Sequence, residues 1–486
     1  MPQTLWENSG TSFRVVIRLR RPITSTDLPR LLFYSARVRS LDMQYPSWFG
    51  TLHHEFLRAL GMSIPSQCFM PKLIHFTWSP KETESQILPI MHHFLGPRIR
   101  KIDLRFADDT AGLSILPYIK SSCPLVSEFC LDFRGEDTLS VCLISDAVCG
   151  WQHLTDLGIP NLDKAGFIHI AQLPSLKKLS LWSAKDTAFF HLPEFLSGPT
   201  FPSLKSLFVC CETARFCTGI VQVISSRQLE RLVIRPLAIW TTSIWEQLHT
   251  ILRDCLDNTS LESIEVEQGH GLGRPADSAR YILSSDALRP LLAFKKLTCV
   301  IYQVYPGLDV DDDFLKEMAL AWPAIETLQF GTQVLITQQP RVTLNCLIAF
   351  AEHCRSLVNL GVRMNATHVP EFTQEPGGRI SNWLNCLEVG TSPITREAHV
   401  AAFLSNLFPE LEFVFPFSHS ELLPEPLDSY ATSWSRVSAM VPVFCTVRSQ
   451  EEEFWTEEVD DDVEKEEQAE TVTVDSLPDV VGLSLP

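Results

Sequence analysis

The sequence predicts an α/β solenoid in the shape of a horseshoe, with a parallel sheet on the concave face and helices on the convex face. Two observations lead to this fold class. An apolar triplet of fixed spacing recurs along the whole chain, and windows with helical periodicity lie between its copies. A repeat of this length is typical of solenoids, whose neighbouring units bury a continuous core.

In each triplet an apolar residue is followed at +3 and +5 by two more apolar residues. Positions +3 and +5 share one face of a strand, because side chains alternate with period two, and the opening residue turns inward from the bend. Consecutive openings lie 22 to 36 residues apart, and the last triplet is the weakest because its +5 position is Pro416. The fourteen triplets open at Val38, Leu73, Ile99, Val126, Leu154, Leu176, Leu204, Leu229, Leu261, Leu297, Ile325, Leu357, Leu384 and Leu411.

Prolines make the repeat harder to ascribe to chance. With 32 prolines in 486 residues, chance alone would place about one proline in the fourteen positions that lie two residues before an opening residue. Proline just ahead of a strand costs no ladder hydrogen bond, so it is tolerated there. Six prolines lie two residues before an opening residue, namely Pro71, Pro124, Pro174, Pro202, Pro323 and Pro409.

Three windows between triplets have one apolar stripe at helical spacing. They are Thr242–Asn258, Leu344–Cys354 and Arg396–Leu407. The stripe of the first comprises Ile244, Leu248, Ile251, Leu252 and Cys255, that of the second Leu347, Ile348 and Ala351, and that of the third Val400, Phe403, Leu404 and Leu407. A strand followed by a helix about every 28 residues is the pattern of the longer kind of leucine-rich repeat.

The chain divides into four predicted regions. Residues 1–37 are a lead-in, residues 38–416 an array of about fourteen repeats, residues 417–449 a cap and residues 450–486 an acidic tail. A terminal repeat would otherwise expose its core, so a cap is required. The tail has twelve acidic residues against one lysine between Glu451 and Glu470, which predicts disorder. The residues expected to cover the last strand are Trp434, Val437, Met440, Val441 and Phe444, with Pro442 as a possible helix start.

Composition limits the partners and the compartment. A formal charge of −18 and a pI near 5.2 argue against nucleic acid or an anionic membrane as a partner. No apolar stretch reaches the length of a membrane span, and the amino terminus lacks the pattern of a secretory signal. Fourteen cysteines without framework spacing indicate reduced thiols. We therefore expect a cytoplasmic or nuclear protein.

Motifs that would indicate chemistry are incomplete, so the sequence predicts no catalytic residue, no cofactor and no metal ligand. Gly269–Gly273 lacks the GxGxxG and Walker spacings and is interpreted as a loop. Asp309–Asp313 lacks the glycine and glutamate of a calcium loop, and Asp311–Asp313 are expected to cap a helix that begins near Phe314. The histidines of His53–Glu55 and of His92-His93 lack metal-ligand spacing.

Two segments resemble a known family. Residues Arg21–Leu41 (RPITSTDLPRLLFYSARVRSL) are similar to the entry into the repeats of mushroom-type fungal F-box proteins, and Trp434–Gln450 (WSRVSAMVPVFCTVRSQ) resembles their end. The Leu/Phe-Pro-x-Leu-Lys-x-Leu copies between them match as well. This resemblance implies the substrate-recognition arm of a cullin-based ubiquitin ligase. The F-box should lie upstream of Arg21, where MPQTLWENSGTSFRVVIRLR is no such segment, so engagement of the cullin adaptor is expected only if an F-box is present upstream.

The predicted function is binding of an unidentified protein, by a monomer without enzymatic activity. The outward positions of the middle triplets are +2, +4 and +6, where exposed aromatic and arginine side chains have the composition of interface hot spots. An alternative is that Trp182 and Phe208 only pack on neighbouring repeats. The candidate residues on the concave face are Lys178, Trp182, Phe208, Arg231 and Arg235.

Two other functions stay open at this point. The chain could be a leucine-rich-repeat scaffold or adaptor with no link to ubiquitin. A remote alternative is a nucleotide-handling enzyme that uses Gly269–Gly273, although a horseshoe lacks the crevice that such sites use.

Overall fold

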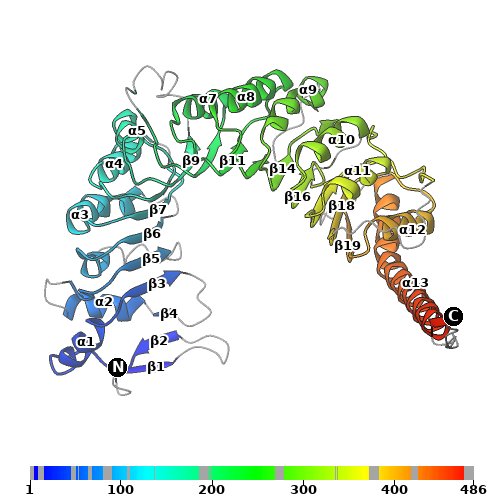
Figure 1. Cartoon of the computed structure of the whole chain (residues 1–486). Coiled ribbons are helices and arrows are strands. Elements are labelled where there is room, and N and C mark those ends of the chain that lie inside the picture. The colour runs from blue at the N-terminus through cyan, green and yellow to red at the C-terminus, as the bar shows by residue number, and fades with distance from the viewer. Residues whose placement is uncertain are drawn as a thin grey trace, which may run out of the picture. The chain divides into compact units, whose positions relative to one another are not determined.

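The structure is a computed structural model of the 486-residue chain (Figure 1). It describes residues 5–8, 16–44, 51–52, 54–63, 68–79, 90–106, 110–135, 137–184, 196, 199–268, 278–333, 335, 338–371, 383–417 and 425–474. The chain divides into two compact units, Met1–Pro306 and Gly307–Pro486.

The dominant element is a parallel sheet of fourteen strands among the described residues, ten in the first unit and four in the second. Each strand begins two residues after the opening residue of a predicted triplet, so the expected strand positions are confirmed. In the first unit these are β3 (Ser40–Gln44), β5 (His75–Ser79), β6 (Lys101–Arg105), β7 (Glu128–Asp132), β8 (Asp156–Ile159), β9 (Lys178–Ala184), β10 (Ser206–Cys211), β11 (Arg231–Pro236), β12 (Ser263–Glu267) and β14 (Cys299–Gln303).

The strands pair in a constant register. The +3 residue of each triplet lies opposite the +3 residue of the next, as Leu179 lies opposite Leu207 and Leu207 opposite Leu232. Every +3 residue except Leu41 is buried, as are the +5 residues except Met43 and Pro416. The prediction that +3 and +5 form the core is therefore confirmed for twelve of the fourteen strands.

The prolines ahead of the strands occupy a turn. At four of the predicted positions the opening residue donates its N–H to the carbonyl three residues earlier, as Ile325 does to Trp322 at 3.1 Å. This places the proline second in a β-turn, where its fixed φ is favourable. Pro97 stands in the same place before Ile99, which the sequence analysis had missed.

Helices of the first unit lie along one side of its sheet (Figure 1). Neighbouring helices pack on one another, α3 on α4, α4 on α5, α7 on α8 and α8 on α9. They are α1 (Leu28–Ser35), α2 (His54–Ser63), α3 (Leu116–Ser122), α4 (Thr138–Val148), α5 (Lys164–Ala171), α7 (Ala214–Val223), α8 (Thr242–Cys255) and α9 (Ser285–Leu288), with short 3₁₀ turns at Thr110–Ile115, Ser278–Tyr281 and Arg289–Ala293 and the short strand β13 (Leu283–Ser284).

The expected stripe of α8 is partly wrong. Leu248 and Leu252 are buried, but Cys255 is exposed, and Trp245 and His249 are buried in its place. His249 is fully enclosed between two partners. Its Nδ1 lies 2.6 Å from the carbonyl oxygen of Ala287, and its Nε2 lies 2.9 Å from the hydroxyl of Tyr302. These polar partners compensate the burial of an imidazole that the apolar pattern did not include.

The lead-in folds into β1 (Trp6–Asn8) and β2 (Val16–Leu19), which form a small sheet with β4 (Thr51–Leu52), followed by α1. The segment that carries the family resemblance is held by one carboxylate. Asp27 accepts two hydrogen bonds from the Arg21 guanidinium, at 2.7 and 2.8 Å, and two from Thr24, at 2.8 and 2.9 Å. The hydrogen bond from Arg21, followed by those from Thr24, holds the pKa of Asp27 well below its usual value.

The second unit contains the strands β15 (Leu308–Asp309), β16 (Thr327–Phe330), β17 (Asn359–Val362), β18 (Cys386–Gly390) and β19 (Phe413–Pro416), of which the last four belong to the parallel sheet. Its helices are α10 (Asp312–Ala321), α11 (Asn345–His353), α12 (Glu397–Leu407) and α13 (Leu427–Val474). The predicted stripes of α11 and α12 are buried, except for the half-buried Ile348.

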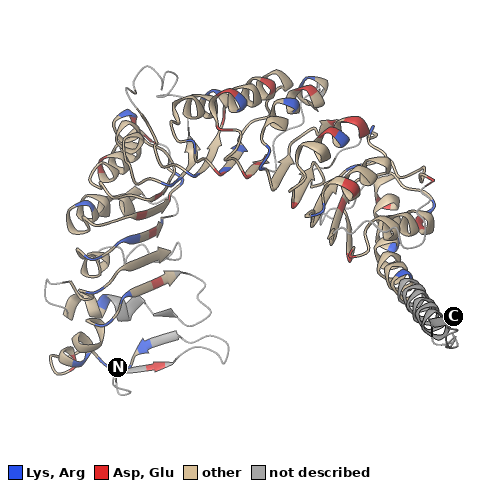
Figure 2. Ribbon diagram, in the orientation of Figure 1, with Lys and Arg blue, Asp and Glu red and all other residues tan. Residues whose placement is uncertain are grey.

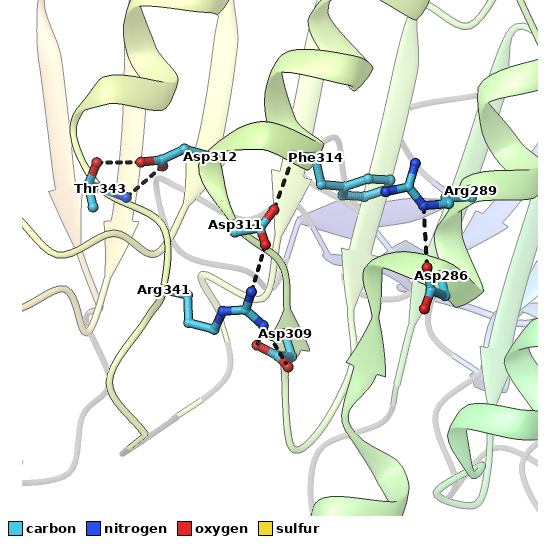
Figure 3. Close-up of polar contacts among 8 residues, drawn as sticks. All are labelled: Asp286, Arg289, Asp309, Asp311, Asp312, Phe314, Arg341 and Thr343. Carbon is cyan, nitrogen blue, oxygen red and sulfur yellow. Dashed lines mark hydrogen bonds and ion pairs between the residues drawn. The ribbon is translucent and has the colours of Figure 1, made fainter.

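The start of α10 confirms the predicted helix cap for Asp311, whereas Asp312 and Asp313 lie in the first turn of the helix. The carboxylate of Asp311 accepts a hydrogen bond from the N–H of Phe314 at 3.1 Å. Asp312, in the first turn, accepts instead from the N–H of Thr343 at 2.7 Å, while Arg341 pairs with Asp309 and Asp311 (Figure 3). These acids therefore stabilise the helix end and the following loop, which explains their clustering without a metal ion.

The predicted cap is the first part of α13, which packs on α12 and β19. Trp434, Val437 and Val441 are buried, whereas Met440 and Phe444 are half-buried. The indole of Trp434 donates to the carbonyl of Ser392 at 2.9 Å.

Two expectations for this end of the chain differ from the structure. Pro442 lies inside α13 and does not start a helix. The helix also continues to Val474, through the segment that was expected to be disordered. The Glu, Lys, Gln and Ala residues of that segment favour helix, which suits the continuation of a helix already anchored upstream. Residues 475–486 lie outside the described residues.

No helix in the described part of the chain is long and apolar enough to cross a membrane. None of the fourteen cysteines forms a disulfide bond.

The buried imidazole of His249 predicts a stability that depends on pH. Burial lowers the pKa of this imidazole from 6.5 to about 4. Between these two pH values the imidazole stays neutral in the folded protein, whereas in the unfolded chain it takes up a proton. The contribution of His249 to stability should therefore be constant above pH 6.5 and fall as the pH drops from 6.5 to about 4, by up to about 3 kcal/mol for a shift of this size. Urea unfolding across this range should show a steeper loss for the wild type than for His249→Gln.

The control is His353→Gln, which removes a histidine from the solvent side of α11. That variant should keep the pH dependence of the wild type. Equal slopes for the wild type and His249→Gln would contradict the assignment of this dependence to His249.

Truncation within α13 tests the cap. A chain ending at Ser418 loses the side chains of Trp434, Val437 and Val441, each worth about 1.5–3 kcal/mol of buried apolar surface. It should melt at a much lower temperature or aggregate. A chain ending at Glu458 keeps every described tertiary contact of α13, of which the last along the chain is made by Arg448, and should melt as the full chain does. A normal melting temperature for the shorter chain would show that the cap is dispensable.

Candidate protein-binding surface

The five predicted binding residues lie on three adjacent strands of the first unit. Lys178 and Trp182 are on β9, Phe208 is on β10, and Arg231 and Arg235 are on β11. Lys178 and Arg231 are both opposite Ser206 in register, and Arg235 is opposite Cys210. All five alternate with the buried core residues, so they share the sheet face that points away from the core.

The three basic side chains are paired with carboxylates of adjacent strands. Lys178 Nζ lies 3.2 Å from Asp156 Oδ1 on β8. On β12, Glu265 Oε1 lies 2.8 Å from Arg231 Nη2, and Glu267 Oε2 lies 2.7 Å from Arg235 Nη2.

These basic side chains are half or more exposed, at 67%, 55% and 50% for Lys178, Arg231 and Arg235. Exposed ion pairs contribute only about 0–1 kcal/mol, so they add little to the fold. Their effect is to neutralise this face locally and to orient the guanidinium groups. This face therefore presents oriented ion pairs and not a positive patch.

The two aromatic residues contact neighbouring strands. The indole of Trp182 lies over Gly158 on β8, where an added Cβ would be 3.0 Å from the ring. The guanidinium of Arg235 lies over the Phe208 ring, 5.2 Å from its centroid. Both aromatic side chains remain half-buried and not enclosed. Packing on neighbours and availability to a partner are thus compatible at these two positions.

The prediction that the outward positions are exposed is wrong for one residue of these strands. Val233, at +4 on β11, is only 6% exposed. In register it stands between Phe208 on β10 and Glu265 on β12, whose longer side chains rise on either side of it. It belongs to the floor of the surface.

Sequence reasoning missed the acidic partners, Asp156, Glu265 and Glu267. A signal was present, because the carboxylates also occupy outward positions one strand away from the cations. Asp156 and Glu267 share the triplet positions of Lys178 and Arg235, whereas Glu265 is at +4 and Arg231 at +2. Lys101 and Glu128 make the same kind of pair across β6 and β7, at 2.8 Å. Reading the +2, +4 and +6 positions across triplets would have found these pairs.

Three thiols on the outward face, those of Cys130, Cys210 and Cys386, are poor nucleophiles. Burial first, and then the nearby Asp103, raises the pKa of Cys130 to about 12. Burial also raises the pKa of Cys210, and burial followed by Glu388 raises that of Cys386 to about 11. At neutral pH these groups stay protonated, whereas the thiolate is the reactive form.

Where the structure describes them, the remaining motifs do not assemble a chemical site. Gly269–Gly273, the candidate nucleotide loop, lies outside the described residues. The rings of His92 and His93 are 4.0 Å apart, and burial followed by the neighbouring His92 lowers the pKa of His93. Within the described ranges, no group of three His, Cys, Asp or Glu residues could hold a metal ion.

In the second unit a small hollow lies beside the loop that carries Arg341. Arg341 is held by Asp309 and Asp311, as Figure 3 shows. Arg363 donates to the carbonyl of Gln338 at 2.6 Å, and burial lowers its pKa to about 10, so it stays charged. No nucleophile or acid–base pair is among the residues that line the hollow, which are Leu308, Val310, Phe330, Pro340, Arg341, Val342, Val362 and Arg363.

Within each unit, basic and acidic residues are interspersed along the helices and strands (Figure 2).

Neither a protein-family model nor a curated protein matches this sequence.

Proposed function

We propose that the chain is a non-enzymatic leucine-rich-repeat solenoid that binds another protein on the sheet face opposite its helices. The observation that carries this proposal is the outward face of β9, β10 and β11, where Trp182 and Phe208 are half-buried among oriented ion pairs. In a solenoid this face would line the concave side. The sequence resemblance makes the substrate-recognition arm of an F-box ubiquitin ligase the preferred role.

The chemistry of the surface suits protein recognition. Tryptophan and arginine are enriched among interface hot spots, because both bury a large area and also make polar contacts. Arg231 and Arg235 are already oriented by Glu265 and Glu267, so less freedom is lost on binding. Neutralised pairs next to aromatic rings favour a partner with apolar and polar groups over a strongly acidic one.

A scaffold or adaptor with no ubiquitin link is the second proposal. This role uses the same surface of β9–β11. It differs from the ligase role only in that the protein does not bind the adaptor of a cullin. A nucleotide-handling activity at Gly269–Gly273 has no described geometry behind it and remains the remote alternative.

Exchange of Trp182 for alanine should weaken partner capture by at least about tenfold, as expected for a hot spot worth more than 1 kcal/mol. Arg231→Ala should also weaken capture, because it removes an oriented guanidinium and leaves Glu265 unpaired. The measurement is affinity capture from lysate of the native source, quantified by mass spectrometry, with melting temperature as a check on folding.

The matched control is Arg253→Ala on α8, an arginine that is similarly exposed and pairs with Asp254 on the helix side. It should capture the same proteins as the wild type. Unchanged capture by both Trp182→Ala and Arg231→Ala would place the binding surface elsewhere.

Co-purification with the adaptor that links F-box proteins to a cullin separates the two roles. We expect no stable complex with the 486-residue chain, because its first described elements are β1, β2 and α1 and not the three helices of an F-box. The same adaptor should bind a chimera that carries an F-box ahead of Arg21. A stable complex with the chain itself would contradict this expectation and assign the ligase role directly.

A further inference from the structure

The outward face of the second unit has a different composition from that of the first. In register, Gln329 on β16, Gly361 on β17, Glu388 on β18 and Phe415 on β19 form one row across four strands. The alternating residues Leu328, Leu360, Leu387 and Val414 are buried on the opposite side. The row therefore presents an amide, a bare backbone, a carboxylate and an aromatic ring on the same face.

The carboxylate of Glu388 reaches across the bare position. Its Oε1 accepts a hydrogen bond from Gln329 Nε2 at 2.9 Å, two strands away, and its Oε2 accepts from Thr332 Oγ1 at 2.8 Å. A Cβ at Gly361 would lie 3.1 Å from Gln329 Cγ and 3.2 Å from Thr332 Oγ1. A side chain here would require Gln329 or Thr332 to shift by a few tenths of an ångström, so glycine gives this arrangement its room and leaves a shallow floor under the carboxylate.

Glu388 is not paired with the nearest outward cation, because Arg363, which follows β17, donates instead to the carbonyl of Gln338 at 2.6 Å. No ion pair joins it to a lysine or arginine in the described part of the chain, although the outward cations of β9 and β11 are all paired. The amide and the hydroxyl orient the carboxylate but leave its charge in place, and each oxygen keeps a free lone pair. A half-buried carboxylate of this kind favours a cation as its next partner.

Two aromatic rings stand beside this charge. Phe413 and Phe415 are 45% and 49% exposed, and their rings are stacked with centroids 5.8 Å apart and planes 3° apart. The edge of β19 is not available for strand addition at this point, because the N–H of Val414 is hydrogen-bonded by Ser438 Oγ of α13 at 3.3 Å. A ligand would therefore lie on the face of the sheet, over the rings.

We propose that this surface, made of Gln329, Gly361, Glu388, Phe413 and Phe415, binds a peptide segment that presents an arginine side chain. The guanidinium pairs with Glu388 and stacks on Phe415, which is its neighbour in register. Arginine fits better than lysine, because its planar group is weakly hydrated, stacks on rings and binds a carboxylate with two hydrogen bonds. A nucleic acid is disfavoured, since its phosphates would meet Glu388 on a chain of net charge −18.

The test is a fluorescence-polarisation titration of the full chain with a short, labelled glycine–serine peptide that carries two arginines. We expect Glu388→Gln to weaken binding by about tenfold, the value of one charge-assisted contact. Phe415→Ala, at a position that is 49% exposed, should weaken binding by about three- to tenfold, with melting temperature as the check on folding. The same peptide with citrulline in place of arginine keeps its shape without the charge and should bind about as weakly as the arginine peptide binds Glu388→Gln.

The matched control is Glu352→Gln on α11, which removes the same charge from the helix side and should leave binding unchanged. Equal affinity of Glu388→Gln and wild type, or no binding of the arginine peptide to the wild type, would overturn the proposal.

Trp182→Ala separates this site from the one on β9–β11. It should leave peptide affinity unchanged even where it abolishes partner capture, because the proposed site lies wholly within the second unit. A loss of peptide binding in Trp182→Ala would place the arginine elsewhere and would also overturn the proposal. The proposed function and this inference both name a protein or peptide as the partner, but they use different residues. Each can therefore be contradicted without the other.

Discussion

The arrangement of both units depends on backbone carbonyls that each accept two hydrogen bonds from the next strand. The carbonyl of Lys177, for example, accepts from the N–H groups of Lys205 and Ser206, at 2.8 and 3.0 Å. The same fork recurs at the residue after the opening position of nine triplets in the first unit and three in the second. It fixes each strand against the next before the ladder begins. A slip of one residue would turn every +3 and +5 side chain to the other face, so the buried core and this fork enforce one register.

Constant register also determines the chemistry of the outward face. Equivalent positions of adjacent strands lie about 4.8 Å apart, close enough for a lysine to meet a carboxylate one strand away. Charges in the first unit therefore form pairs between adjacent strands, as Lys178 does with Asp156 opposite it in register. The two distinctive arrangements of the outward face occur where a glycine takes the place of a side chain in a row of equivalent positions. Gly158 makes room for the Trp182 ring, and Gly361 makes room for the carboxylate of Glu388.

The two candidate surfaces thus differ in what they offer a partner. On β9–β11 the charges are satisfied within the sheet, and the aromatic rings are the groups with free area. On β16–β19 a carboxylate is oriented but not neutralised, and it stands beside exposed rings. The first composition suits apolar contact with modest polar specificity, whereas the second suits recognition of a cation. Both follow from short side chains at single positions and not from a cavity.

The sequence by itself determined the strands, because each depends on a local pattern: an apolar triplet, a turn and often a proline. It also determined the inward face, the cap of α10 by Asp311 and the role of Trp434, since these follow from periodicity and from side-chain chemistry near in sequence. Only the tertiary structure decided which residues meet across strands. Asp156 and Lys178 are 22 residues apart in the chain, and the pairing of Glu388 with Gln329 spans 59. The burial of His249 and Val233 was likewise set by neighbours on other elements, which no local pattern contains. The helix of residues 451–474 was missed for a related reason, because α13 is anchored upstream by contacts of Trp434 and Arg448 with α12 and the loop before it.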